Sequence, residues 1–510
     1  ILLHVTSLPG PYGTGTLGAP AAAFARRLGA AGIRYWQMLP LCPPDSTDSP
    51  YQSLSAFAGN PLLIDPAELA ATGRVSAEEA EACRCGCTGG GGDSGYSPDE
   101  RTADFRTAAR KRDALLRLAC SRLTHGDRER VRGYADRERL WLPDFARFMA
   151  ARSRFGGRPW WEWPDEGLRR RTDAALAEFD AASADEIFFQ MYVQYEFAFQ
   201  WNALQAAAHS SGVRLFGDMP IYVSRNSSDV WSRSELFEMD EALAPLRVAG
   251  VPPDYFSEDG QLWGNPLYDW GVAGRDGYTW WLSRIDHALR LFDAVRIDHF
   301  RGFEAYWAVA ADRTNAREGI WENGPGMDLF RRVAARFPDA EIIAEDLGLL
   351  TARTLAFLAE TGYPGMRVMQ FAFDGSPDNA HLPYNHPVNS VAYIGTHDND
   401  TLSGWLERES PDAVRRSARY CRAESDRPAD ICRAWIQTLW SSPARLAVAT
   451  AQDLLVLDGS RRMNVPGVAE GNWTFRLTAS EMDAIDFAWL RLIGATYGRL
   501  SADGGVPAGN

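Results

Sequence analysis

The sequence predicts an α/β fold of the (β/α)8 TIM-barrel class, with helical insertions between the strands and no obvious C-terminal β-sandwich domain. Short apolar runs recur along the chain, and several of them end in polar residues. Helical stretches separate the runs, which is typical of parallel strands joined by crossover helices. The length of 510 residues also suits a single large barrel with insertions.

Seven apolar runs are expected to form barrel strands. In chain order they cover 34–41, 213–223, 292–300, 341–348, 365–373, 390–400 and 446–455. A short eighth strand is expected near "NPLLID", residues 60–65. Eight strands are the number that this class of barrel needs.

Two stretches interrupt the strand pattern, so we expect insertions within a single barrel that covers residues 1–510. Residues 66–185 show long helical patterns without strand signals, which predicts a mainly helical inserted subdomain. Residues 224–290 are expected to form a loop-rich insertion. In the aromatic run 188–201, the aromatic side chains recur at helical spacing and are expected in the core: Phe188, Tyr192, Tyr195 and Phe199.

The composition excludes several classes of partner. The chain has 53 Lys and Arg against 67 Asp and Glu, a net charge of −14, which disfavours nucleic acid or an anionic membrane. No apolar stretch approaches the roughly 20 residues that span a bilayer. The chain begins "ILLHVTSLPG", without the pattern of a signal peptide. Seven cysteines in so long a chain do not indicate a disulfide framework, so a cytoplasmic location is expected.

Three motifs match a functional pattern only in part. The glycines of "YGTGTLG" (12–18) do not follow a strand, so a turn-rich loop is expected in place of a dinucleotide site. The stretch 398–409 resembles a calcium loop, but its fifth place, which should offer an oxygen ligand, holds Leu402, and its sixth, which should be Gly, holds Ser403, so calcium is disfavoured. "CRCGC" (83–87) has no second cysteine pair, so a surface loop is favoured over zinc.

Carboxylates close four of the predicted strands. In a barrel the carboxyl ends of the strands converge on one mouth, so acids that are far apart in sequence would meet there. One such acid could be structural, whereas four together indicate a site. The four are Asp218, Asp298, Glu345 and Asp398, and Arg296 and His397 lie beside two of them.

The segment "AVRIDHFRGF" (294–303) indicates the chemistry. Side chains alternate along a strand, so Arg296 and Asp298 share one face, where a structural ion pair is the simplest interpretation. Within an acid cluster the same pair would hold Asp298 ionised, as a nucleophile requires. Glu345, among apolar neighbours, would have the raised pKa of a proton donor. Two such acids in a chain rich in aromatic residues suit glycosyl transfer.

The sequence resembles the 4-α-glucanotransferases known as amylomaltase or disproportionating enzyme, within the α-amylase clan of barrels. The resemblance runs nearly end to end. Its blocks include "LLHVTSLPGPYG", "DSPYQSLSAFAGNP", "FGDMPIYV", "LWGNPLYDW", "VRIDHFRGF", "AEDLG", "GMRVMQF", "YIGTHDNDT" and "RMNVPGVAEGNWTFRL".

The resemblance implies a role for individual residues. Asp298 would be the nucleophile, Glu345 the general acid and base, and Asp398 the transition-state stabiliser. Further residues would bind the glucan, with Trp263 as a stacking platform in the 224–290 part of the cleft. These are Arg296, His299, His397, Ser49, Tyr51, Asp218, Asp254, Trp263, Asp374 and Asn464.

The resemblance also implies the activity and the substrates. The protein would move segments of α-1,4-glucans, such as maltooligosaccharides, amylose or glycogen-derived dextrins, to the 4-hydroxyl of another glucan or of glucose, without a cofactor. Two alternatives stay open from the residues alone. They are a glucan hydrolase of the same clan and a non-catalytic glucan-binding protein.

Overall fold

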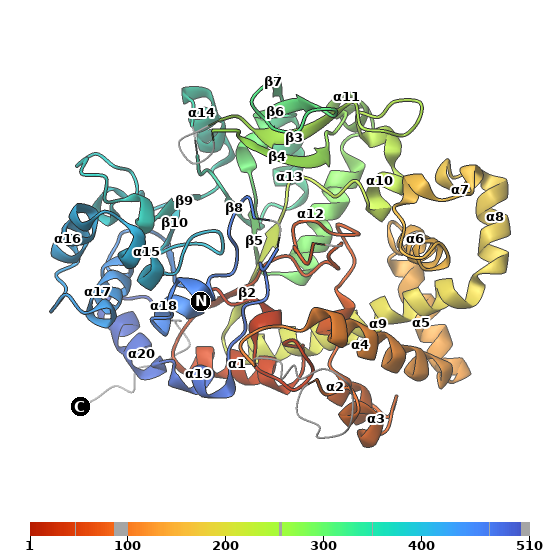
Figure 1. Cartoon of the computed structure of the whole chain (residues 1–510), viewed down its shortest axis with the longest axis horizontal. Helices are drawn as coiled ribbons and strands as arrows, with labels where there is room; N and C mark the ends of the chain where they lie inside the picture. The colour runs from red at the N-terminus through yellow and green to blue at the C-terminus, as the bar shows by residue number, and fades with distance from the viewer. Residues whose placement is uncertain (46, 86–99, 254–257, 349, 469, 501–510) are drawn as a thin grey trace.

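The parallel strands of the computed structural model form two sheets (Figure 1). The structure describes residues 1–45, 47–85, 100–253, 258–348, 350–468 and 470–500. One sheet has the order β1-β2-β5-β8 and the other the order β11-β10-β9. Their bounds are β1 Tyr35–Gln37, β2 Arg214–Met219, β5 Ala294–Ile297, β8 Glu341–Ala344, β9 Gly365–Val368, β10 Ser390–Tyr393 and β11 Leu446–Val448. Each strand lies within one of the seven predicted runs.

Backbone contacts join the two sheets at both edges. Leu2 forms parallel bridges to Gln37, at the end of β1, and to Thr450, just beyond β11. On the other side, the Ala344 N–H donates to the Pro364 carbonyl at 3.0 Å, which links β8 to the start of β9. The N-terminal segment therefore takes the place of the eighth strand, and the predicted (β/α)8 class is confirmed.

The predicted strand near 60–65 is wrong. Pro61–Leu63 forms a 3-10 helix, and the Asn60 side chain accepts a hydrogen bond from the Leu62 N–H. Pro61 has no N–H to donate to a ladder and is well suited to the first turn of a helix. The short apolar run was misread because periodicity does not distinguish a buried strand from a short helical turn.

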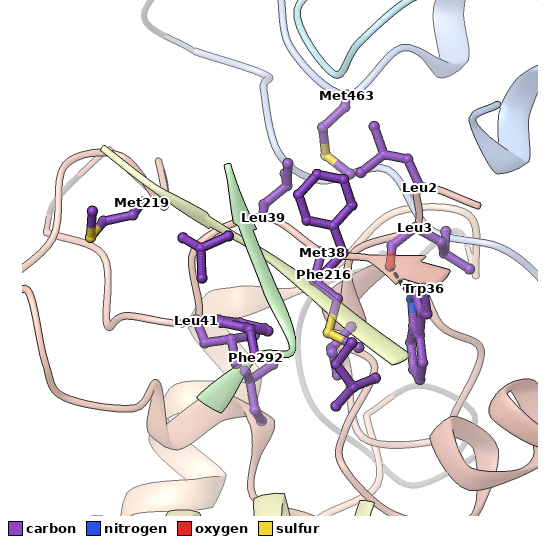
Figure 2. Close-up of a cluster of buried hydrophobic side chains, with 14 of the residues drawn as sticks. Leu2, Leu3, Trp36, Met38, Leu39, Leu41, Phe216, Met219, Phe292 and Met463 are labelled. Atoms are coloured by element: carbon purple, nitrogen blue, oxygen red, sulfur yellow. Dashed lines mark hydrogen bonds between the residues drawn. The ribbon is translucent and has the colours of Figure 1, made fainter. Parts of the chain in front are cut away.

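The N-terminal segment packs into the hydrophobic core that surrounds β1 and β2 (Figure 2). Leu2 and Leu3 are 5% and 2% exposed, and they lie in a cluster with Trp36 and Phe216. The Trp36 indole N–H donates to the Leu3 carbonyl at 2.7 Å. A buried indole N–H needs such a partner, so this bond helps to hold the N-terminal segment against β1.

The described residues between 66 and 182 form helices and turns. Several of these helices gather at one side of the molecule in Figure 1. Many of their buried side chains, such as Leu115, Val131 and Phe148, belong to the same hydrophobic cluster as the barrel, whereas Ala135, Leu142 and Phe145 belong to a second cluster. The boundary of a separate subdomain at 66–185 stays a prediction. The helices are α2 Pro66–Ala71, α3 Ala77–Glu81, α4 Phe105–Ser121, α5 His125–Arg137, α6 Leu142–Arg154, α7 Glu166–Arg169 and α8 Asp173–Ala182.

The region 224–290 contains regular structure that sequence analysis missed. The strands β3 (Arg247–Val251) and β4 (Gln261–Pro266) pair antiparallel and join β6 (Ala305–Ala310) and β7 (Ile320–Asn323) in the order β4-β3-β6-β7. This small sheet lies at the top of Figure 1. Gly and Pro weaken the strand signal in β3 and β4, because these residues are depleted in strands. The helices of the region are α10 Ser228–Ser232, α11 Trp270–Arg275 and α12 Thr279–Leu291.

The long helix α9 (Ala184–Ser210) contains the aromatic run at 188–201. Tyr192 is fully buried as predicted, but Phe199 is 49% exposed, so its expected place in the core is wrong. None of the helices in the described ranges combines the length and apolar character needed to cross a membrane. The other α-helices are α1 Ala19–Ala30, α13 Met327–Arg336, α14 Ala352–Thr361, α15 Leu402–Arg408, α16 Pro411–Tyr420, α17 Pro428–Trp440, α18 Ala451–Leu454, α19 Ala479–Ala484 and α20 Phe487–Thr496.

The glycine-rich segment 12–18 forms bends ahead of α1, with Gly13 at φ +80°, and this confirms the predicted turn-rich loop. Cys83 is buried and Cys85 partly buried, whereas Cys87 lies outside the described residues. Over the described parts of the chain, no group of three or more His, Cys, Asp or Glu side chains is placed to hold a metal ion.

Candidate active site

Three of the four predicted acids stand at the carboxyl ends of neighbouring strands. Asp218 lies in β2 opposite Arg296 in β5, and Arg296 is in turn paired with Ile343 in β8. Asp298 follows β5 directly, and Glu345 follows β8 directly. Because parallel strands start from the same end of a barrel, their last side chains gather at one mouth.

Arg296 connects two of these acids. Its Nη1 donates to Asp218 Oδ1 and Oδ2 at 2.8 and 2.7 Å, and its Nη2 donates to Asp298 Oδ1 at 2.7 Å. Burial alone would lower the pKa of Arg296, but the charges of Asp218 and Asp298 raise it well above its usual value. Arg296 therefore stays charged and holds Asp298 in one orientation.

Asp218 pairs with Arg296 and does not line an exposed surface of the site. Its side chain has no exposed surface, and its Oδ2 also accepts a hydrogen bond from the Tyr51 hydroxyl at 2.7 Å. A direct contact to substrate, as sequence analysis predicted for Asp218, is closed off by these two neighbours. Asp298 differs, because 27% of its side chain is exposed and can meet a ligand.

Glu345 is almost buried, at 9% exposed. Its Oε2 accepts a hydrogen bond from the His299 N–H at 2.8 Å, and its Oε1 accepts one from the Leu347 N–H at 2.7 Å. Burial nevertheless raises the pKa of Glu345 to about 7, against the opposing effects of Arg296 and the Leu347 N–H. Glu345 can thus hold or release a proton near neutral pH.

Asp398 lies in the loop between β10 and α15, with 45% of its side chain exposed. Its Oδ1 accepts a hydrogen bond from Asn464 Nδ2 at 2.6 Å, and its Oδ2 lies 3.4 Å from His397 Nε2. The His397 ring stacks on Tyr51, with 5.1 Å between the ring centroids. Since Tyr51 also binds Asp218, these contacts place Asp398 beside the Arg296 cluster.

Trp263 in β4 borders the same cluster. Its ring meets His299 edge to face, with 4.8 Å between the centroids, and it is partly buried. Burial lowers the pKa of His299 to about 4, so this imidazole is neutral at pH 7. The small antiparallel sheet thereby brings an aromatic ring to the residue that follows Asp298.

The structure gives fewer contacts for the remaining predicted residues. Ser49 lies beside Tyr51, because its Oγ accepts a hydrogen bond from the Tyr51 N–H at 3.3 Å. Asp374 is exposed, and its Oδ1 accepts a hydrogen bond from the Ser376 N–H at 2.8 Å, so a local turn fixes its carboxylate. Asp254 lies outside the described residues.

Two residues of the site were not singled out from the sequence. The Trp473 ring lies 5.6 Å from Tyr51 and 6.0 Å from His397 between centroids. Arg462 Nη2 donates to the Asp398 carbonyl at 2.7 Å. Both lie in the block "RMNVPGVAEGNWTFRL". The sequence of this block does not show which of its residues belong to the site and which only pack in the core.

The barrel and its unlike carboxyls define an enzyme that acts on glycosidic bonds. One carboxylate is held by a cation, and the other carboxyl is buried and can be protonated, which is the pair that such chemistry needs. Comparison with known proteins makes the assignment specific. The family model described as 4-alpha-glucanotransferase matches residues 3–481.

Individual proteins agree with the family match. The chain is 44% identical to a 4-alpha-glucanotransferase of Thermus thermophilus, over 98% of both chains. It is 41% identical to one of Streptococcus pneumoniae, over 94% of this chain and 93% of the other. The solved amylomaltase from Streptococcus agalactiae in complex with acarbose is 36% identical and superposes with a TM-score of 0.92, over 98% of this chain and 99% of that one.

This chain belongs to the 4-alpha-glucanotransferase family. It is a transferase that acts on glucans, and of the two alternatives left open above, the hydrolase is not favoured.

Proposed function

We propose that this enzyme transfers α-1,4-glucan segments through a covalent glucosyl-enzyme on Asp298. The observation that carries the proposal is the contrast between two carboxyls at one barrel mouth. Asp298 is bound by Arg296 at 2.7 Å, whereas burial raises the pKa of Glu345 to about 7. An ionised nucleophile and a protonated acid are what the first step of a retaining mechanism requires.

In the first step an Asp298 oxygen attacks the anomeric carbon of the donor. The glycosidic C–O bond breaks, and Glu345 donates its proton to the departing oxygen. In the second step Glu345 accepts the proton of the acceptor 4-hydroxyl, whose oxygen displaces Asp298 from the anomeric carbon. Two displacements retain the configuration of that carbon.

The other residues of the mouth orient the sugar. Asp398, held by Asn464, has exposed carboxylate surface that can bind sugar hydroxyls more tightly in the transition state. His299 and His397 would complete the subsite around the cleaved bond. Trp263 would offer an aromatic face from the 224–290 region, and Ser49 and Tyr51 would contribute from the loop after β1. Roles for Asp254 and Asp374 stay predictions.

The substrates we propose are α-1,4-glucans as donors, and a second glucan or glucose as acceptor. The fold match to an amylomaltase in complex with acarbose supports a site for sugars of this kind. We expect no cofactor, and no nucleic-acid or membrane partner. A cytoplasmic location, suggested by the cysteine content, stays a prediction.

The test is an incubation with maltotriose. The unmodified enzyme should release glucose and build a ladder of longer maltooligosaccharides, while the total of reducing ends stays nearly constant. Asp298→Ala and Glu345→Gln should each lose nearly all transfer, because each removes one half of the double displacement. Reducing ends that rise in step with donor consumption, with nothing longer than the donor, would show a hydrolase.

A fluoride donor separates the two roles. Fluoride leaves α-glucosyl fluoride with little help from an acid, so Glu345→Gln should still form a covalent adduct that mass spectrometry detects. Asp298→Ala should form none. Equal adduct formation by both variants would overturn the assignment of Asp298 as the nucleophile.

A further inference from the structure

We propose that Arg462 is a positioning residue, which holds the Asp398 loop in the geometry that stabilises the transition state. This inference rests on the role proposed above for Asp398. No residue type or motif in the sequence points to Arg462. Its role is inferred from contacts between two segments that lie 64 positions apart.

The Arg462 guanidinium binds both partners of the Asp398–Asn464 hydrogen bond through their backbones. Its Nη2 donates to the Asp398 carbonyl, and its Nε donates to the Asn464 carbonyl, each at 2.7 Å. Its side chain is 15% exposed. One planar group thus sets the spacing between Asp398 and the amide that binds its carboxylate at 2.6 Å.

The two segments are also packed tightly enough to transmit a displacement. Asp400 Oδ2 lies 3.8 Å from Arg462 Nη1 and 2.8 Å from Arg408 Nη1. A Cβ on Gly404, in α15, would meet Asp400 Oδ1 at 2.4 Å and the Gly459 Cα at 2.8 Å. The backbone of α15 therefore packs closely against Asp400 and Gly459, and we expect loss of the Arg462 fork to shift the Asp398 loop.

The chain offers a matched control in the preceding residue. Arg461 is 13% exposed and donates to the Arg476 carbonyl at 2.8 Å and to Glu481 Oε1 at 2.9 Å. It anchors the same segment to a different part of the chain and does not reach Asp398. A merely structural role for Arg462 would make the two arginines equivalent.

We expect Arg462→Gln to lower kcat with maltotriose about 10- to 100-fold with little change in KM, because small misplacements of a catalytic group cost rates of this order. Arg461→Gln should keep kcat within about threefold of the unmodified enzyme, because this substitution leaves the reacting groups in place. Arg462→Lys, which keeps the charge but not the fork, should recover part of the rate. An equal loss of kcat in Arg462→Gln and Arg461→Gln would overturn the proposal.

A double-mutant cycle tests whether Arg462 acts through Asp398. In an Asp398→Asn background, assayed with α-glucosyl fluoride and an acceptor glucan, Arg462→Gln should cause little further loss. Losses that multiply would overturn the proposal, as would full activity in Arg462→Gln. If Arg462→Gln does not fold, Arg462→Lys carries the same cycle. A fully active Asp398→Asn would instead contradict the proposed role of Asp398, which separates the two failures.

Discussion

Arg296 carries its charge inside the barrel and divides its guanidinium between two carboxylates. Asp218 supports it from a fully buried position, whereas 27% of the Asp298 side chain is exposed. A buried cation would be costly without such partners. The pair therefore explains why a strand that is buried along its length ends in charged residues, and why Asp298 is held in one orientation.

Glu345 is the residue whose titration should be visible in the activity. Burial raises its pKa to about 7. It must be protonated to act as the acid in the first step, so kcat/KM with maltotriose should fall as the pH rises through about 7, approaching tenfold per pH unit. The measurement is a pH profile of kcat/KM between pH 5 and 9.

The fluoride donor supplies the control for this profile. α-Glucosyl fluoride needs little acid assistance in the first step. Its kcat/KM should therefore fall less steeply at alkaline pH than the kcat/KM for maltotriose. Two superimposable alkaline limbs would contradict Glu345 as the titrating acid and would point to another group.

At the scale of elements, the short turn after β5 arranges the site. His299 has φ +49°, in the left-handed region that His tolerates better than most residues. This turn directs the His299 N–H to Glu345 and places the His299 ring against Trp263. One turn therefore links the proposed nucleophile, the proposed acid and the small antiparallel sheet.

The strand β4 should decide between transfer and hydrolysis. Trp263→Ala removes the aromatic face that we expect to hold the acceptor sugar, so water should compete better for the glucosyl-enzyme. Reducing ends should then rise over time with maltotriose. As a matched control, Trp321→Ala changes a ring on β7 of the same sheet, which is 44% exposed and packs on Trp307. An unchanged ratio of transfer to hydrolysis in Trp263→Ala would contradict the proposal that Trp263 holds the acceptor sugar.

At the scale of the whole molecule, residues 1–3 connect the two sheets. Leu2 bridges the strands on both sides, and Leu3 is 2% exposed within the core. The segment 458–464 comes from the other end of the chain and completes the Asp398 environment. The site therefore depends on closure of the barrel as well as on its acids.

Barrel closure can be tested through stability. Leu3→Ala should lower the free energy of unfolding by about 2–5 kcal/mol, because it leaves a cavity where the N-terminal segment packs. The measurement is urea unfolding, with the slope of the transition compared between variants. Leu140→Ala, at a side chain that is 60% exposed, should stay within about 0.5 kcal/mol of the unmodified protein. A loss no larger in Leu3→Ala than in Leu140→Ala would contradict a closing role for the segment.

The sequence by itself determined the fold class, the seven strands and the acids that follow them. These features are local, because an apolar run followed by an acid is visible within about ten residues. The resemblance to 4-α-glucanotransferases added the expected roles of Asp298, Glu345 and Asp398, since its blocks cover nearly the whole chain.

Only the tertiary structure decided which segment is the eighth strand, that Asp218 is closed off by Arg296 and Tyr51, and that Arg462 holds the Asp398 loop. Each of these depends on contacts between residues tens to hundreds of positions apart. Such contacts leave no periodicity in the sequence, because a buried Asp paired with an Arg and an exposed Asp at the barrel mouth cannot be told apart before the chain folds. Burial and pairing, which set the pKa of a group and its access to substrate, arise only when the barrel closes.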